Sequence, residues 1–156
     1  IDPSEPPQVL DGRQIVQGVE FGFAGAVTEE WQVFGGYAFM DSEIEESNNA
    51  AELGNALGNT PEHSFNLWTT YELPWNFEIG GGAQYVGERH NNNTGARTAP
   101  DYLLFDAMAA YKANEHVTLR LNVYNLADEE YIDRIGGGLF IPGAGRSAVL
   151  TANFAY

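Results

Sequence analysis

Hydrophobic and polar residues alternate with a period of two in seven stretches of the chain. In the stretch HSFNLWTTYEL, for example, Phe65, Leu67 and Tyr71 occupy one set of alternate positions and Ser64 and Asn66 belong to the other. Successive side chains of a β-strand point to opposite faces, so this period predicts strands. The predicted strands are 13–27, 31–40, 63–73, 77–88, 102–112, 117–126 and 147–156.

The connections between these strands alternate in length. Short turns are predicted at 28–30, 74–76 and 113–116, and long polar segments at 41–62, 89–101 and 127–146. A tilted strand of about ten residues crosses the hydrocarbon of a bilayer, whereas strands of soluble sandwiches average about five to six. Short turns on one side and long loops on the other are typical of outer-membrane barrels. The pattern predicts an all-β, antiparallel transmembrane barrel segment, and its first long segment, 41–62, is too polar and too rich in Gly and Asn to pack as a core element.

The two faces of the predicted strands differ in chemistry. One face carries charged and amide side chains such as Glu20, Gln84, Asp106 and Arg120. An unpaired charge in a soluble core costs several kcal/mol, but a water-filled lumen or an exposed face tolerates it. The other face is apolar and is predicted to face the membrane through Phe21, Phe23, Val33, Leu67, Ile79, Leu119, Leu121 and Leu150.

Composition narrows the class of protein further. The 156 residues suffice for one domain, with 22 acidic and 7 basic side chains and a formal net charge of −15. Such a charge argues against a nucleic-acid partner, because little is available to neutralise phosphates. The absence of cysteine excludes disulfides and thiolate metal sites. No apolar run is long enough for a membrane-spanning helix.

The residue types that perform catalysis show no recognisable arrangement. His63, His90 and His116 lack the spacing of metal ligands, and the adjacent acids Glu45 and Glu46 fall in a predicted loop without burial. We therefore expect no enzyme activity, no catalytic residue and no metal centre. For the acidic segment 41–62, a calcium site and a plain solvated loop both stay open.

Several longer motifs carry a family resemblance. They are QGVEFG at 17–22, WQVFGGY at 31–37, NTPEHSFNLWTTYEL at 59–73, NVYNLADEEY at 122–131 and PGAGRSAVLTANFAY at 142–156. With these motifs the chain resembles the C-terminal part of a TonB-dependent outer-membrane siderophore receptor, most closely the catecholate type. The last strand, with Leu150, Phe154 and Tyr156, resembles the C-terminal targeting strand that the barrel assembly machinery reads.

The resemblance implies a place for the chain in a larger assembly. It implies a 22-stranded barrel in the bacterial outer membrane, filled by a plug and importing ferric siderophore with TonB coupling. The chain has seven of the strands and neither plug nor TonB box, so residues 1–12 are expected to be a loop remnant and 13–156 the C-terminal barrel part. Its expected partners are membrane lipids, the remaining barrel and plug, the assembly machinery and, only through the plug, TonB.

Candidate ligand contacts follow from the charge of the implied cargo. A ferric catecholate is anionic and would favour arginine and aromatic neighbours. The candidates are Arg89, His90, Arg97, Tyr131 and Arg134, and for each a loop salt bridge is the alternative role. The alternative function for the whole chain is a structural or interaction module that self-assembles, or pairs with partner chains, through open strand edges.

Overall fold

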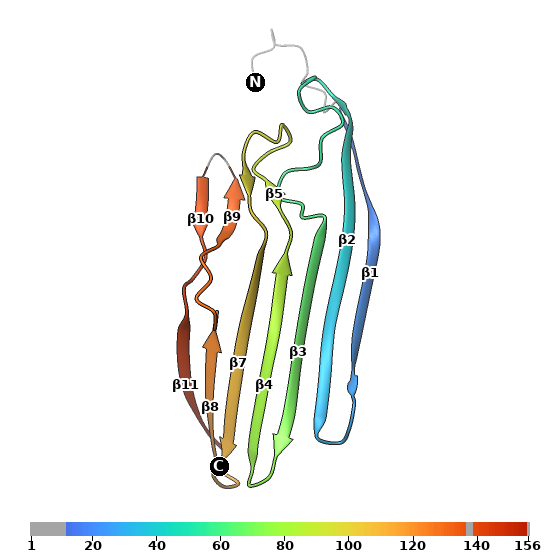
Figure 1. Cartoon of the computed structure of the whole chain (residues 1–156). Helices are drawn as coiled ribbons and strands as arrows, with labels where there is room; N and C mark the ends of the chain where they lie inside the picture. The colour runs from blue at the N-terminus through green and yellow to red at the C-terminus, as the bar shows by residue number, and fades with distance from the viewer. Residues whose placement is uncertain (1–11, 137–138, 156) are drawn as a thin grey trace, which may run out of the picture.

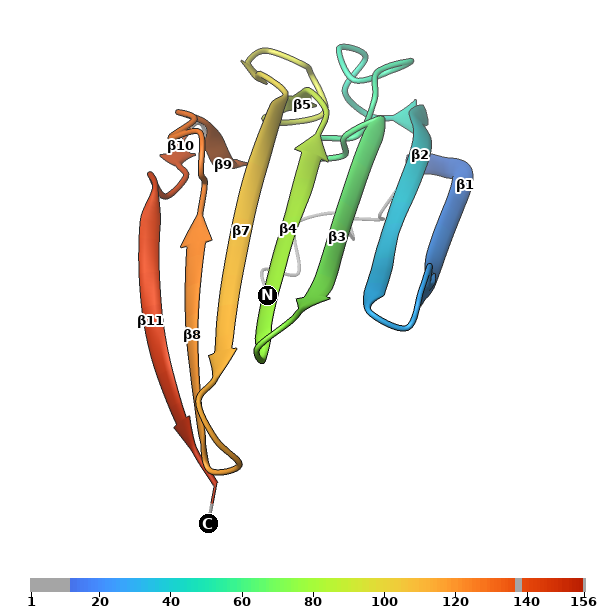
Figure 2. The same ribbon diagram turned by 60° about the horizontal axis from the view of Figure 1, so that its bottom comes forward.

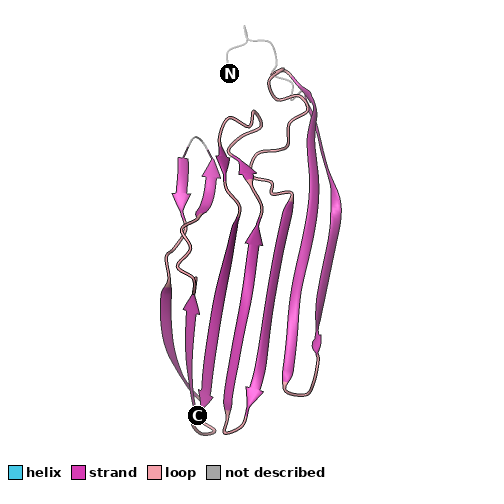
Figure 3. Ribbon diagram, viewed as in Figure 1, coloured by secondary structure: helices cyan, strands magenta, loops and turns pink. Residues whose placement is uncertain are grey.

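The computed structural model describes residues 12–136 and 139–155, and this part of the chain consists of strands and loops (Figures 1 and 3). Seven long strands form one antiparallel sheet, which we call the wall. They are β1 (Gly12–Ala26), β2 (Trp31–Ser47), β3 (His63–Leu73), β4 (Phe77–Val86), β7 (Tyr102–Lys112), β8 (Val117–Tyr124) and β11 (Ser147–Phe154). No helix in the described residues is long and apolar enough to span a membrane.

The strands of the wall are neighbours in chain order, β1-β2-β3-β4-β7-β8-β11. As a result, the short turns gather at one end of the sheet and the long connections at the other (Figure 1). This arrangement confirms the predicted alternation of connection lengths. Figure 2 shows the wall as an open sheet whose first and last strands, β1 and β11, are not joined to each other.

The strand register separates the two faces of the wall. Residues paired across antiparallel strands share a face, as in the row Phe23–Gly35–Leu67–Ala83–Phe105. Propagating such rows places all eight predicted membrane-facing residues on one face, which we call the apolar face. Six of these eight side chains are exposed, for example Phe21 at 62% and Leu150 at 72%, and Val33 and Leu67 are partly exposed. That this face contacts lipid stays a prediction.

The opposite face, which we call the polar face, carries Glu20, Asn66, Gln84, Asp106 and Arg120. Glycines let larger side chains lie flat on it. A Cβ at Gly82 would collide with the ring of Trp68, and one at Gly80 would lie 3.2 Å from the terminal methyl of Met108. Gly80 and Gly82 therefore mark close packing of side chains against the backbone.

Strand β2 is longer than the sequence predicts. We expected 41–62 to be a loop, but β2 continues to Ser47 and pairs with the first residues of β1, including Gly12. The prediction is wrong because apolar alternation ends at Met40, whereas backbone pairing with β1 continues through the mostly polar and charged residues 41–47, among which Ile44 is buried. Gly12 thus belongs to a strand, and residues 1–11 of the expected loop remnant lie outside the described residues, as does Tyr156 of the last strand.

The long connections contain two small hairpins, β5 (Arg89–His90) with β6 (Thr98–Ala99), and β9 (Ile132–Gly136) with β10 (Leu139–Pro142). The expectation that segment 41–62 is too polar to pack as a core element is also wrong, since it contains the buried Ile44, and the other two long segments contribute buried residues as well. Ala99 is completely buried, and Ile44 and Ile135 are exposed by only 1% and 3%. Polar segments achieve this burial because they pack on one another and on the projecting end of β2.

Candidate ligand-binding loops

Three connections lie together at one end of the wall: 48–62, 87–101 and the described part of 125–146 (Figure 1). We call them loops one, two and three, and together the loop cap. All five candidate ligand contacts belong to loops two and three. The first question is therefore which of their side chains are available to a ligand and which hold the cap together.

Arg89 of loop two points into the cap. The residue is 7% exposed, its Nη1 donates to the carbonyl of Asp133 at 2.8 Å, and its Nη2 donates to that of Ile132 at 2.6 Å. The guanidinium carbon lies 5.4 Å from the centre of the Tyr102 ring. Among the described residues, its buried Nε has no hydrogen-bond partner. This geometry ties loop two to loop three and disfavours a direct ligand contact through Arg89.

Asn59 makes the corresponding connections from loop one. Its backbone N–H donates to the carbonyl of His90 at 2.8 Å, and its side-chain amide donates to the carbonyl of Ile135. The backbone of Asn59 has φ of 61°, a left-handed conformation that asparagine adopts more readily than most residues. Asn59 therefore connects loop one to loop two through its backbone N–H and to loop three through its side chain.

The other candidates are arranged around this junction. Tyr131 lies against Tyr102 with ring centroids 4.5 Å apart, so it shares that ring with Arg89. Arg134 projects outward with 78% of its side chain exposed and its Nε 3.3 Å from a carboxylate oxygen of Asp133. The structure thus brings Arg89, Tyr131 and the base of Arg134 together.

His90 and Arg97 belong to the β5–β6 hairpin and its tip. One ring nitrogen of His90, Nδ1, is 3.3 Å from the hydroxyl of Thr98. The backbone of Arg97 is bound twice to Asn91, once through each backbone group, at 2.9 Å and 3.1 Å. The hairpin therefore places His90 at the contact with Asn59 of loop one and Arg97 at the end of the hairpin tip.

The electrostatics of the loop cap are dominated by carboxylates. The three loops carry eight acidic residues and only four arginines, Arg89, Arg97, Arg134 and Arg146. Arg89 and Arg146 donate to main-chain carbonyls inside the chain. Among these arginines, Arg134 keeps 78% of its side chain exposed, so attraction of an anion by this part of the protein would depend largely on it. No group of three or more metal-ligating side chains occurs among the described residues.

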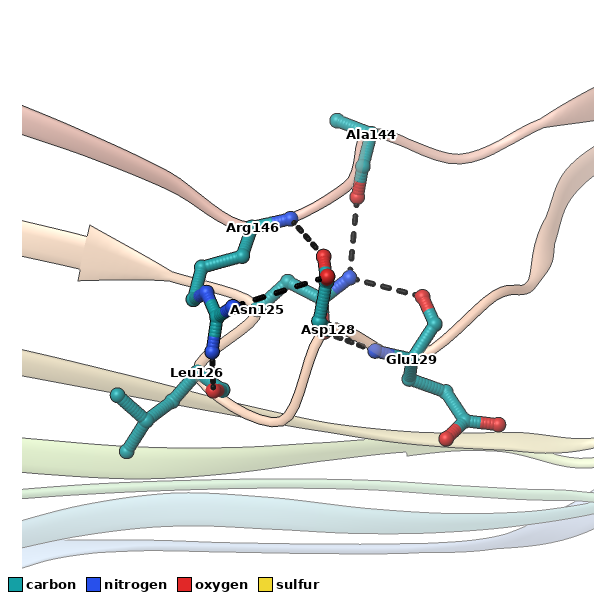
Figure 4. A network of polar contacts seen from close by, with 6 residues as sticks. All are labelled: Asn125, Leu126, Asp128, Glu129, Ala144 and Arg146. Carbon is teal, nitrogen blue, oxygen red and sulfur yellow. Dashed lines mark hydrogen bonds and ion pairs between the residues drawn. The ribbon is translucent and has the colours of Figure 1, made fainter.

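A second polar network, which the sequence did not suggest as a site, closes the base of loop three (Figure 4). Asn125 is 4% exposed, and its Nδ2 donates to the carbonyls of Glu129 at 2.9 Å and Ala144 at 3.1 Å. Its Oδ1 accepts the backbone N–H of Glu129 at 2.8 Å, and its own N–H donates to Asp106 at 2.8 Å. We call this network the Asn125 clasp.

Asp128 and Arg146 extend the clasp toward β11. A carboxylate oxygen of Asp128 accepts the backbone N–H of Arg146 at 2.8 Å, and the second oxygen lies 3.8 Å from the guanidinium. The guanidinium also donates to the carbonyl of Leu126 at 3.4 Å. The motifs at 122–131 and 142–156 are thus two halves of one structure, in which polar side chains fix where β8 ends and β11 begins.

Comparison with known proteins now decides the family. Residues 2–126 match the model of the family described as "TonB dependent receptor-like, beta-barrel". The chain belongs to this family. It is therefore a wall segment of a TonB-dependent receptor barrel, an outer-membrane fold of receptors rather than enzymes.

Sequence similarity to individual members of the TonB-dependent receptor family extends over all or nearly all of the chain. It is 38% identical to the probable TonB-dependent receptor BfrD of Bordetella pertussis, with all of this chain and 22% of the relative covered. It is 37% identical to the catecholate siderophore receptor Fiu of Escherichia coli K12, with 93% and 20% covered. The chain thus spans about a fifth of the length of these relatives.

Solved structures of TonB-dependent receptors show the same wall. The siderophore receptor PiuA of Acinetobacter baumannii superposes with a TM-score of 0.88 at 33% identity, over 93% of this chain and 22% of that one. The closed form of the ferric-catecholate import receptor Fiu from E. coli K12 superposes with a TM-score of 0.83 at 36% identity, over 92% and 21%. The predicted fold class is confirmed.

Proposed function

We propose that this chain forms part of the barrel wall and three outer loops of a receptor that imports ferric siderophores of the catecholate class across the outer membrane. The observation that carries the proposal is the shared wall: the chain superposes on receptors named for siderophore and ferric-catecholate import over more than nine tenths of its length. The continuous apolar face and the grouping of the long loops at one end suit a barrel wall in a bilayer.

The partners of the chain follow from its two open edges. Strands β1 and β11 each pair on one side only within the described sheet. Unpaired backbone groups in hydrocarbon cost several kcal/mol each, so in a membrane both edges need further strands. We propose that the rest of the same barrel supplies them, that a plug fills the lumen along the polar face, and that TonB acts through that plug. Leu150, Phe154 and Tyr156 are proposed as the strand that the barrel assembly machinery reads.

For ligand contact we propose His90, Arg97, Tyr131 and Arg134. The exposure and charge of Arg134 support its role as a ligand contact. The packing of the Tyr131 ring on Tyr102, three residues before Arg134 in the chain, supports that of Tyr131. Arg89 receives a different role below. The iron complex is the cargo and no resident cofactor is proposed, while calcium binding by the acidic segment 41–62 stays a prediction.

Uptake of labelled iron tests the proposal. Cells that express the full-length receptor, cells that lack its gene, and cells whose TonB is inactivated are given ⁵⁵Fe as a catecholate complex or as a hydroxamate complex. We expect uptake of the catecholate complex only where receptor and TonB are both present. Uptake that is indifferent to the receptor would overturn the proposal. Recovery of the protein as a soluble self-assembled polymer would instead favour the alternative, an interaction module that pairs through its open edges.

A further inference from the structure

The placement of Arg89 is unusual for a residue in an acidic surface loop. Its guanidinium is removed from water, although the burial of a cation is costly unless its donors are satisfied. Two of its nitrogens meet carbonyl oxygens, whereas the buried Nε has no partner among the described residues. No carboxylate forms an ion pair with it among the described residues. An aliphatic residue would avoid the cost of burying a cation, so the arginine at this position does more than fill space.

The guanidinium of Arg89 binds the backbone of loop three. Its two donors bind the consecutive carbonyls of Ile132 and Asp133, which lie between Tyr131 and Arg134 in the chain. The same guanidinium lies over Tyr102, whose ring packs on Tyr131. A planar fork with two fixed donors sets both the position and the direction of the backbone it binds, which the single point charge of lysine cannot do.

We propose that Arg89 is a positioning residue for ligand binding. It fixes the start of β9 so that Tyr131 and Arg134 are presented together to an anionic iron(III)–catecholate complex, while Arg89 itself does not touch the ligand. The inference rests on the proposed function for the nature of the ligand. Binding is favoured because the segment is ordered before the ligand arrives, so that less conformational entropy is lost on association.

Contacts from loop one support a preordered segment. The side-chain amide of Asn59 takes the carbonyl of Ile135, three residues beyond the first carbonyl held by Arg89. Arg89 and Asn59 together therefore occupy the carbonyls of Ile132, Asp133 and Ile135 in β9 from neighbouring loops. Ile135 is 3% exposed, which anchors the same strand by apolar packing. The proposed ligand-facing segment is thus bound by residues of loops one and two, and Arg89 makes the contacts that come from a charged side chain.

The test uses the full-length receptor in outer-membrane vesicles with ferric 2,3-dihydroxybenzoate as the probe. Three variants are compared with the wild type. Arg89→Lys keeps the charge but loses the fork, and Arg134→Gln removes a proposed contact that is exposed. Arg13→Lys is the matched control, because Arg13 makes an exposed ion pair with Glu45 on β2, outside the loop cap. The measurements are the Kd of the probe and ligand-free hydrogen exchange of amides 131–136 in the vesicles, and the uptake rate at saturating probe in intact cells with active TonB.

We expect Arg89→Lys to raise Kd by about tenfold and to speed exchange at 131–136 by at least about tenfold, since two charge-assisted hydrogen bonds are lost. The uptake rate at saturating probe should stay close to wild type. Arg134→Gln should raise Kd without changing exchange, and Arg13→Lys should change neither. Faster exchange with unchanged Kd in Arg89→Lys would overturn the inference, because the tie would then be only structural.

Two further results are decisive. A raised Kd with unchanged exchange in Arg89→Lys would also overturn the inference, because Arg89 would then act by touching the ligand. A wild-type receptor that binds no catecholate complex would overturn the proposed function and with it the ligand named here. The ligand-free exchange would still show by itself whether Arg89 orders 131–136, so the two failures can be told apart.

Discussion

The wall and the loop cap are built on opposite principles. In the wall, large apolar side chains remain exposed, as Phe21 and Leu150 do at 62% and 72%, and the backbone is held by a regular ladder. In and around the loop cap, Ala99 and Ile135 are almost completely buried, and Asn59, Arg89 and Asn125 bind backbone groups of distant segments. The wall by itself buries few side chains, whereas the loop cap has a small buried core.

The difference shows where each region obtains its stability. Exposed apolar area in the wall gains free energy only when something apolar covers it, and in an outer-membrane barrel that cover is lipid. The cap lies where water competes for every polar group, so it depends on buried side-chain donors whose loss leaves backbone acceptors unsatisfied. In the wall, the cost of a substitution should therefore depend on which face the residue lies on and how deep in the bilayer it is. In the cap, the cost should depend on which individual hydrogen bonds are lost.

The largest effect is expected from a charge in the middle of the apolar face. Leu121 lies between Ala109 and Leu150 in the register, and Leu121→Arg should destabilise the barrel by about 2–4 kcal/mol if lipid covers this face. Reversible unfolding of the full receptor in lipid vesicles measures the change. Asn122→Arg, one residue away on the polar face, is the control and should cost less than about 1 kcal/mol. Equal costs at the two positions would contradict the assignment of faces.

In the cap, the largest effect should come from the Asn125 clasp. Asn125→Ala removes the side-chain bonds to Glu129 and Ala144, and it should cost about 1–3 kcal/mol because buried groups lose their partners. Asn125→Gly is the control for the backbone, since Asn125 has φ of 50°. If the clasp matters, the glycine variant is also destabilised in denaturant titrations. A glycine variant as stable as wild type would assign the effect to backbone conformation alone.

A smaller effect is expected at a turn of the wall. Trp75 has φ of 64° and is 83% exposed, so its indole packs little in the chain while its backbone is in the left-handed region. In detergent, Trp75→Gly should be more stable than Trp75→Ala by about 1 kcal/mol, because only glycine relieves the strain. Thermal unfolding of the two variants gives the difference. An alanine variant that equals or exceeds the glycine variant would contradict the strained turn.

The smallest effect should come from an ion pair exposed on the projecting end of the wall. Arg13 and Glu45 are 2.9 Å apart with side chains 62% and 36% exposed. Solvent screens such a pair, so a double-mutant cycle with Arg13→Gln and Glu45→Gln should give a coupling below about 1 kcal/mol. A coupling well above that value would mean that this end of β1 and β2 is less open to water than the structure shows.

The same contrast explains what could be predicted from the sequence. The strands of the wall are visible because lipid and water impose a period of two, and β3 was predicted with its observed bounds, His63–Leu73. Strand β2 was cut short at Met40 because apolar alternation ends there, although pairing does not. Strand β8 was extended to Leu126, but the left-handed backbone of Asn125 ends it at Tyr124.

The site was less accessible to sequence reasoning. The charge and residue type of Arg89 suggested a ligand contact, but its burial depends on carbonyls 43 and 44 residues away, which no local pattern encodes. In the sequence, Asn125, Asp128 and Arg146 stand out only as parts of two motifs. Their meeting in one clasp depends on the β8–β11 register, so the motifs showed that the residues matter without showing why.

The claim that the apolar face meets lipid is tested most directly by nitroxide scanning of β8. Single spin labels at 118–123 in the full receptor, reconstituted in lipid, report accessibility to oxygen, which partitions into hydrocarbon, and to a water-soluble nickel chelate. If the apolar face meets lipid, oxygen maxima are expected at 119, 121 and 123, and nickel maxima or occluded positions at 118, 120 and 122. Oxygen maxima at the even positions, or no alternation at all, would contradict it.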